Sequence, residues 1–128
     1  MIVDTSALIA ILRNEPEAGA FTDLLLSSAA VRISAGTLLE TRIVAERDRG
    51  LTELDELLAT LGVEVVPVDA VQVRLASEGF RRFGKGRHPA GLNFGDLFAY
   101  ALARAFDETL LFKGDDFSKT DLRPAATG

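Results

Sequence analysis

The sequence of 128 residues contains no cysteine, no tryptophan and a single histidine, His88. Without cysteine the chain can form neither a disulfide nor a thiolate metal site, and one histidine cannot build a multi-histidine zinc site. A chain of this length buries enough surface to fold without either device. Any metal must therefore be held mainly by oxygen ligands, which hard cations such as Mg²⁺ and Mn²⁺ prefer.

Long uncharged segments are also missing from the sequence. No stretch approaches the roughly 20 apolar residues of a membrane span, and the N-terminus lacks the basic region of a secretory signal. We therefore expect a cytoplasmic protein without a membrane partner. The net charge of −5 disfavours nonspecific attraction to nucleic acid over the whole surface, so binding to nucleic acid would require a local basic patch.

The composition is that of a globular domain, with 48% hydrophobic and 26% charged residues, which argues against disorder. We expect one domain over residues 1–128, with a frayed tail at 124–128. Strand-like and helix-like segments alternate through most of the chain. This alternation predicts an α/β fold with a mainly parallel sheet flanked by helices on both faces.

Apolar runs and turn residues give the expected boundaries of these segments. Strands are predicted at residues 2–3, 31–34, 63–68 and 109–112, with a last edge strand at 121–123. Helices are predicted at 5–12, 15–27, 37–49, 52–61, from 69 to about 78, and at 93–103. The turn before the third helix is placed at 35–36, and the glycine-rich segment 79–89 is expected to be a mobile loop.

Several acids stand alone in apolar surroundings. Asp4 directly follows the first strand, Glu40 lies among the apolar residues of the third helix, and Asp96 is in the first turn of the last helix. Asp115 and Asp116 follow the strand at 109–112. Because the carboxyl ends of parallel strands meet at one edge of a sheet, these acids could converge there.

Each acid also has a simpler explanation on its own. Asp4 and Asp96 could cap helices, Glu40 could be a solvated helix residue, and Asp115–Asp116 could be a turn. Clustered carboxylates without a cation, however, would raise one another's pKa. A divalent cation relieves that repulsion, polarises phosphoryl oxygens and lowers the pKa of a bound water. The clustered acids therefore favour phosphodiester hydrolysis.

A basic run, Arg81, Arg82, Lys85 and Arg87, precedes Asp96 and forms the densest positive patch of an acidic chain. Such a run is either a solvated surface or a set of contacts to phosphate. We interpret the neighbouring His88 as a loop residue or a phosphate contact rather than a metal ligand.

Four parts of the chain together resemble the PIN-domain ribonucleases, specifically the VapC toxins of type II toxin–antitoxin systems. They are Val3-Asp-Thr-Ser-Ala-Leu8, Glu40 on the third helix, Gly91-Leu-Asn-Phe-Gly-Asp-Leu-Phe-Ala-Tyr-Ala-Leu102 and Leu111-Phe-Lys-Gly-Asp-Asp-Phe117. The resemblance spans nearly the whole chain. It implies a PIN-like three-layer sandwich around a parallel sheet of strand order 3-2-1-4-5.

The resemblance also implies an activity and partners. The activity is that of a Mg²⁺-dependent endoribonuclease toxin, with Mn²⁺ as an alternative cation. The partners are an RNA substrate, a small VapB-type antitoxin whose C-terminal segment enters the active-site groove, and a second copy in a homodimer. Arg81, Arg82, Lys85 and Arg87 would then bind the RNA backbone.

The family's acids carry over to this sequence residue by residue. Asp4 and Asp96 match the metal ligands, and Glu40 matches the third acid. Either Asp115 or Asp116 fills the fourth position, and Asp116, directly before Phe117, is the first choice. All of these acids are candidate metal ligands.

Two alternative functions remain at this stage. One is a receiver-type signalling module, in which clustered acids bind Mg²⁺, an aspartate accepts phosphate and Lys113 supplies a cation. The other is a PIN-like domain that has lost catalysis and only binds a partner. The sequence leaves open the RNA target and whether one or two metal ions act.

Overall fold

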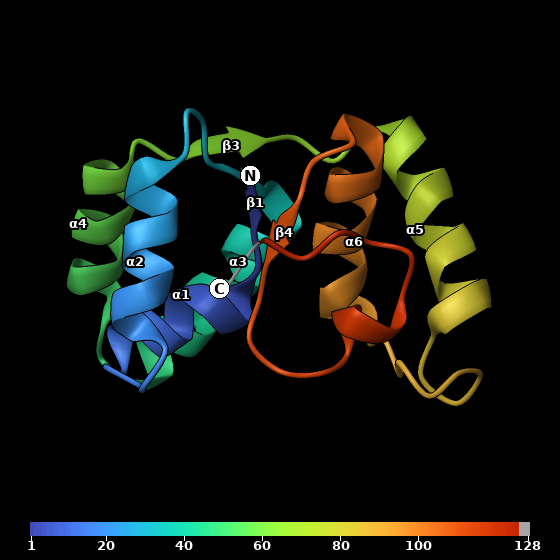
Figure 1. Ribbon diagram of the computed structural model, residues 1–128, viewed down its shortest axis with the longest axis horizontal. Coiled ribbons are helices and arrows are strands. Elements are labelled where there is room, and N and C mark those ends of the chain that lie inside the picture. Colours follow the sequence, from blue (N-terminus) through green and yellow to red (C-terminus); the bar gives the residue numbers. More distant parts are fainter. Residues whose placement is uncertain (126–128) are drawn as a thin grey trace.

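The computed structural model describes residues 1–125, which form a parallel sheet flanked by helices (Figure 1). The strands are β1 (Ile2–Val3), β2 (Arg32–Ser34), β3 (Glu64–Val66) and β4 (Leu110–Leu111). The helices are α1 (Thr5–Leu12), α2 (Ala18–Ser27), α3 (Ala35–Arg47), α4 (Leu51–Leu61), α5 (Ala70–Phe83) and α6 (Phe94–Phe106), with a short 3₁₀ helix η1 (Phe117–Lys119). None of these helices is long and apolar enough to span a membrane.

The sheet has the order β3-β2-β1-β4, with all pairs parallel. Ile2 of β1 is paired with Leu110 of β4, and Val3 with Leu111. Side chains alternate across a strand, so Ile2 and Leu110 pack against α5 and α6 while Val3 and Leu111 pack against α1, α2 and α4. The two helical layers lie on opposite sides of the strands in Figure 1. The predicted three-layer α/β sandwich is thus confirmed.

The edge strand predicted at 121–123 does not form in the described residues. The backbone N–H of Leu110 donates to the carbonyl of Arg123 at 3.0 Å, and that of Ala125 donates to the carbonyl of Leu110 at 2.8 Å. These bonds make a single parallel bridge between Leu110 and Pro124. In the described residues the fifth strand of the expected order 3-2-1-4-5 is thus reduced to this bridge.

The predicted fraying begins at residue 124, but the bridge extends through Pro124 and Ala125. Ala125 is buried in the core that contains α1 and α2. The rest of the predicted tail, residues 126–128, lies outside the described residues.

Helix α3 begins directly at the end of β2, without the predicted turn at 35–36. Ser34 has an extended backbone, and its hydroxyl accepts the N–H of Gly36 at 3.2 Å. A serine in this position satisfies one of the free N–H groups of the first turn, so the helix starts at Ala35. The helix that carries Glu40 therefore follows β2 without an intervening turn.

Helix α5 continues to Phe83, although the sequence predicted that a loop would begin at Gly79. A Cβ atom on Gly79 would lie 2.5 Å from Cε1 of the fully buried Tyr100, so this glycine permits close packing of α5 on α6. Arg81 and Arg82 consequently lie in the last turn of a helix. The prediction of a loop was wrong here because glycine serves tight packing as well as turns.

The loop between α5 and α6 is short and anchored at its base. Lys85 donates its backbone N–H to the carbonyl of Leu92 at 2.9 Å, and Leu92 donates to Phe83 at 2.9 Å. Leu92 and Ala90 are buried. Within the loop, the N–H of Ala90 donates to Nδ1 of His88 at 3.0 Å, which agrees with the interpretation of His88 as a loop residue.

Candidate active site

The four acids lie on elements that meet at the carboxyl end of the sheet, at the lower side of Figure 1. Asp4 directly follows β1, and Glu40 is in the second turn of α3, which follows β2. Asp96 is in the first turn of α6, and Asp116 directly precedes η1 after β4. The parallel topology therefore places all four on the same side of the molecule, as the sequence predicted.

A cleft of about 280 Å³ opens between α1, α3 and α6. Asp4, Glu40 and Asp96 line it, together with the apolar Ile9 and Val44 and the basic Arg13. Asp116 is exposed outside this lining, but its negative charge contributes to raising the pKa of Asp96. The three lining acids form the centre of the site and Asp116 lies at its margin.

Asp4 is held at the end of β1 by its neighbour Ser6. Its Oδ2 accepts the backbone N–H of Ser6 at 3.0 Å and the Ser6 hydroxyl at 2.7 Å. The Oγ of Ser6 in turn accepts the backbone N–H of Lys113 at 2.9 Å. Oδ1 of Asp4 is buried without a hydrogen-bond partner among the described residues. One face of the carboxylate is thus fixed by the protein and the other is left without a donor.

Burial is the largest cause of the raised pKa of Asp4. The hydrogen bonds from Ser6 oppose that effect, and the negative charge of Glu40 adds to it. A buried carboxylate oxygen without a donor is costly, and a cation is one of the few partners that compensate for it.

Two observations define the position of Glu40, whose side chain extends from α3 into the site. Its Oε1 accepts the hydroxyl of Thr5 at 2.8 Å, which links α3 to the first turn of α1. On the other side, a Cβ atom at Gly95 would lie 2.0 Å from Oε2 of Glu40. The carboxylate therefore occupies space that only a glycine leaves open, directly beside Asp96.

Asp96 forms a capping box at the start of α6. Its carboxylate accepts the N–H of Asn93 at 3.0 Å, and its own N–H donates to Oδ1 of Asn93 at 2.9 Å. The pKa of Asp96 is raised to about 6, and burial is the largest cause. The negative charges of Asp4, Asp116 and Glu40 add to this rise, and the bond from Asn93 opposes it. Asp96 thus experiences the repulsion that the sequence predicted for converging acids.

The turn after β4 distinguishes Asp116 from Asp115. Asp116 is among the charges that raise the pKa of Asp96, whereas Asp115 is not. The carbonyl of Asp115 accepts the hydroxyl of Ser118 at 2.6 Å, a contact within the turn itself. These observations favour Asp116 as the fourth acid.

The side chains at this site are chemically suited to bind a hard divalent cation. Every candidate ligand is a carboxylate oxygen, and Oδ1 of Asp4 is buried without a donor. In residues 1–125, however, no three His, Cys, Asp or Glu side chains are arranged as a preformed cage for one ion. Separate partners hold the acids, Ser6 for Asp4, Thr5 for Glu40 and Asn93 for Asp96.

The four predicted basic contacts do not line the cleft. Arg82 pairs with Asp121 at 3.3 Å and Glu78 at 3.7 Å, and its guanidinium lies 4.8 Å from the centre of the Phe83 ring. Arg87 lies 5.1 Å from the centre of the Phe80 ring. Arg81 and Lys85 are exposed and form no ion pair within residues 1–125.

Sequence reasoning missed four residues of the site, namely Thr5, Ser6, Arg13 and Gly95. Thr5 and Ser6 entered the sequence analysis only as part of the motif around Asp4, although hydroxyl groups next to an acid are also a signal for hydrogen bonds to carboxylates. Gly95 directly precedes Asp96, where a missing side chain suggests close approach of another group. Arg13 follows Thr5 by two helical turns and so lies on the same face of α1.

Comparisons with known proteins agree with this architecture. The profile of the PIN domain family matches residues 1–122. Ribonuclease VapC42 of Mycobacterium tuberculosis is 46% identical over 131 aligned residues, which cover 99% of this chain and all of that protein. Ribonuclease VapC28 of the same organism is 48% identical, covering 98% of this chain and 97% of the other. A ribonuclease VapC of Mycolicibacterium smegmatis is 46% identical, covering 95% and 97%.

Two solved structures share the fold. VapC20 of Mycobacterium tuberculosis, described as a sarcin-ricin loop cleaving toxin, superposes with a TM-score of 0.72 at 23% identity, covering 96% of this chain and 98% of that chain. A toxin–antitoxin complex from Klebsiella pneumoniae gives a TM-score of 0.72 at 17% identity, covering 94% and 92%. The profile match and the full-length identities together show that the chain belongs to the PIN-domain family, within its group of VapC ribonucleases.

Proposed function

We propose that this protein is the ribonuclease toxin of a VapBC-type toxin–antitoxin system and hydrolyses RNA phosphodiester bonds with Mg²⁺ or Mn²⁺. The full-length similarity to VapC ribonucleases supports an RNA-cleaving hydrolase. The observation that carries the metal dependence is the buried Oδ1 of Asp4, which has no donor within residues 1–125, on an acid that lines a cleft with Glu40 and Asp96.

Asp4 and Asp96 would hold the cation, with Glu40 and Asp116 completing the negative charge around it. When bound, such a cation polarises the phosphodiester and makes a water molecule more acidic. Ser6 fixes Oδ2 of Asp4, so Oδ1 remains available to a ligand. Thr5 orients Glu40 beside Asp96, whose pKa of about 6 reflects its burial and the repulsion from neighbouring acids that a cation would relieve.

RNA would approach an acidic cleft, which requires positive charge around it. Four basic residues were predicted to bind the RNA backbone. Among them, Arg81 and Lys85 have exposed side chains that are accessible to a phosphate. Arg82 and Arg87 are already engaged with side chains of the protein, Arg82 through ion pairs and Arg87 through the ring of Phe80. We expect Arg81 and Lys85 to contribute more to RNA binding than Arg82.

The proposed partners are a small VapB-type antitoxin and a second copy of the chain. A toxin–antitoxin complex among the structural neighbours supports the antitoxin. The homodimer is supported by an apolar surface at α3 and α6, where Phe94 is 78% exposed and Leu39 62% exposed. Grooves of about 350 and 290 Å³ flank Phe94. Large exposed apolar patches are uncommon on monomeric proteins and mark association sites.

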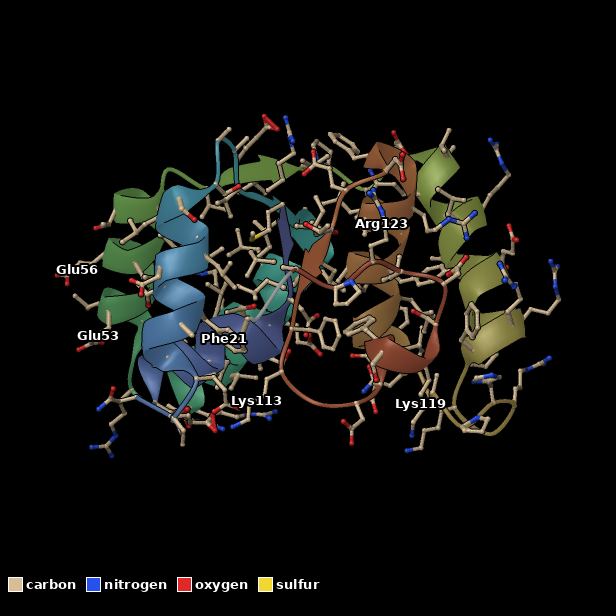
Figure 2. All side chains as sticks on the ribbon, viewed as in Figure 1. Phe21, Glu53, Glu56, Lys113, Lys119 and Arg123 are labelled. Atoms are coloured by element: carbon tan, nitrogen blue, oxygen red, sulfur yellow. The ribbon has the colours of Figure 1, made fainter. Side chains whose placement is uncertain are left out.

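The structure weakens the receiver-type alternative. That function needs a lysine free to contact an acidic phosphate site. Lys113, labelled in Figure 2, instead pairs with Glu15 at 2.5 Å and Glu17 at 3.2 Å. Asp96 also opens a helix, whereas a phosphoacceptor should end a central strand.

A cleavage assay with labelled RNA tests the proposed function. The wild-type protein should cleave in Mg²⁺ and lose activity in a chelator, and Asp4→Asn should be inactive in Mg²⁺. Asp69→Asn is the matched control, because Asp69 also caps a helix, α5, but lies away from the cleft. Equal cleavage by Asp4→Asn and Asp69→Asn, or cleavage that survives chelation, would contradict the proposal.

An expression test addresses the toxin role and the inactive-domain alternative. The wild-type protein expressed alone should arrest growth, whereas Glu40→Gln should not, because arrest would follow from RNA cleavage. Sequencing the RNA ends formed after induction would identify the target. Growth arrest by both forms would show that toxicity does not depend on Glu40.

A further inference from the structure

Two matching rows of side chains, one on α1 and one on α3, line one wall of the acidic cleft, and the α3 row continues past this lining to Asp48. Residues four apart on a helix lie on one face. The row on α1 is Thr5, Ile9 and Arg13, and the row on α3 and its C-cap is Glu40, Val44 and Asp48. Thr5 bonds to Glu40 at 2.8 Å at one end, and Nε of Arg13 bonds to Oδ2 of Asp48 at 2.8 Å at the other.

Arg13 lines the cleft with Asp4, Glu40 and Asp96, and it is the single basic residue of that lining within the described chain. Its backbone is fixed as the C-cap of α1, where its N–H donates to the carbonyl of Ile9 at 2.9 Å. Its side chain is 52% exposed. Arg13 is therefore a positioned cation at the rim of an acidic site.

The contact with Asp48 uses only part of the guanidinium. A guanidinium has five N–H donors. In the guanidinium of Arg13, only Nε donates a hydrogen bond within residues 1–125. The two terminal nitrogens are left for another acceptor. Two adjacent N–H donors match the spacing of two phosphate oxygens, which arginine binds as a fork.

An exposed ion pair such as Arg13–Asp48 adds little to folding stability. Its effect is instead to restrict the direction of the guanidinium. A pre-oriented side chain loses less conformational entropy when it binds a ligand. Asp48 is thus a positioning residue for Arg13.

We infer that Arg13, oriented by Asp48, binds a phosphate of the RNA backbone that flanks the cleaved bond. Eight residues separate Thr5 from Arg13, which corresponds to a rise of about 12 Å along α1. The acids at the Thr5 end and the guanidinium at the other end therefore contact different phosphates of one strand. This inference rests on the proposed ribonuclease function and adds a substrate-binding contact to it.

Equilibrium binding of a labelled single-stranded RNA oligonucleotide tests the contact, measured against salt concentration with Ca²⁺ in place of Mg²⁺. Arg13→Gln should weaken binding about tenfold, the effect of losing a charged hydrogen-bonding contact. It should also make the slope of log affinity against log salt shallower by about 0.7, the value for one phosphate on a single strand. Arg13→Lys keeps the charge and should restore the slope.

Arg42→Gln is the matched control. Arg42 also forms one ion pair, between Nη1 and Asp55 at 2.7 Å, and is 42% exposed, but it does not line the cleft. Its loss should leave both the affinity and the salt slope unchanged. If Arg13→Gln and Arg42→Gln have the same slope, or if Arg13→Lys does not restore it, Arg13 does not contact a phosphate.

Steady-state cleavage in Mg²⁺ separates this contact from the chemistry. Arg13→Gln should raise KM about tenfold with kcat retained, because a flanking contact holds substrate and transition state alike. A fall in kcat at unchanged KM would overturn the flanking assignment. If the wild type binds RNA but does not cleave it, the ribonuclease proposal fails while the salt slopes still decide the role of Arg13. If the wild type does not bind RNA, both fail.

Discussion

The carboxylate of Glu40 lies where a side chain on Gly95 would begin, since a Cβ atom there would be 2.0 Å from Oε2. An acid from α3 thereby reaches the first turn of α6 and lies beside Asp96. The helices α3 and α6 are distant in sequence, yet each contributes an acid to this side of the site. They can do so because Gly95 has no side chain.

Gly95→Ala should displace Glu40 and reduce RNA cleavage by about 10-fold to 100-fold, the scale expected when a site group moves by about 1 Å. Folding stability should change by less than about 1 kcal/mol, because alanine favours the helix and offsets part of the clash. Cleavage rates and urea unfolding measure the two effects.

Gly19→Ala is the control for this substitution. Gly19 lies in α2, and a Cβ atom there would meet nothing within 4 Å. The control should retain full activity and gain roughly 0.5–1 kcal/mol in stability. Full activity of Gly95→Ala would mean that the position of Glu40 is unimportant for cleavage.

Thr5→Val should lower cleavage while Thr5→Ser should not. Valine has nearly the shape of threonine but cannot donate the hydrogen bond that holds Oε1 of Glu40 at 2.8 Å. Losing a hydrogen bond to a charged group costs about 1.5–3 kcal/mol, which corresponds to at least a tenfold loss of rate if Glu40 acts in the reaction. Single-turnover cleavage by both variants measures the difference, and equal rates would exclude an orienting role for the Thr5 hydroxyl.

Asp96→Asn should stabilise the metal-free protein at neutral pH. The pKa of Asp96 in the folded protein, about 6, is above the ordinary value, so the folded state binds the proton more tightly than the unfolded state. The free energy of unfolding contributed by this group therefore falls as pH rises from about 4 to about 6 and stays low above that range.

The variant lacks this penalty, which we expect to be about 2 kcal/mol at pH 7.5 after allowance for the partial exposure of Asp96. Urea unfolding in a chelator should show the gain near pH 7.5 and almost none near about pH 2.5, which lies below the pKa of both states, so that the carboxyl is protonated in each. A destabilised Asp96→Asn at pH 7.5 would show that its capping bonds outweigh the repulsion.

Mg²⁺ or Mn²⁺ should raise the thermal midpoint of the wild-type protein. A ligand at ten times its dissociation constant adds about 1.4 kcal/mol to the free energy of unfolding. The shift should be smaller near pH 5, where Asp96 is mostly protonated, and should disappear in Asp4→Asn. Thermal unfolding with K⁺ at matched ionic strength is the control, and an equal shift with K⁺ would argue against a specific divalent site.

Much of this arrangement follows from short-range patterns in the sequence. Asp4 and Asp96 could be located because each is an isolated charge at the junction of an apolar segment and a helix. The order of helices and strands followed from periodicity. The strand predicted at 63–68 forms as β3, an edge strand that ends immediately before Pro67, a residue that cannot donate to a ladder.

The remainder depends on contacts between distant segments. Gly79 is indistinguishable from a turn glycine until its neighbour Tyr100 is known, and the position of Gly95 before Asp96 does not reveal that the approaching group is Glu40. The basic run was assigned to a loop because of Gly79, whereas packing on Tyr100 keeps Arg81 and Arg82 in α5. The guanidinium of Arg13 joins the site because α1 and α3 pack in register, which no local pattern specifies.

Ser6 receives the backbone N–H of Lys113, which is 107 residues further along the chain, and passes a hydrogen bond to Asp4. The first acid in the sequence is thus oriented by the segment that directly follows β4. A chain in which β4 has not yet paired with β1 cannot complete this arrangement. The orientation of Asp4 is therefore acquired when these two strands come together, and not when β1 and α1 form by themselves.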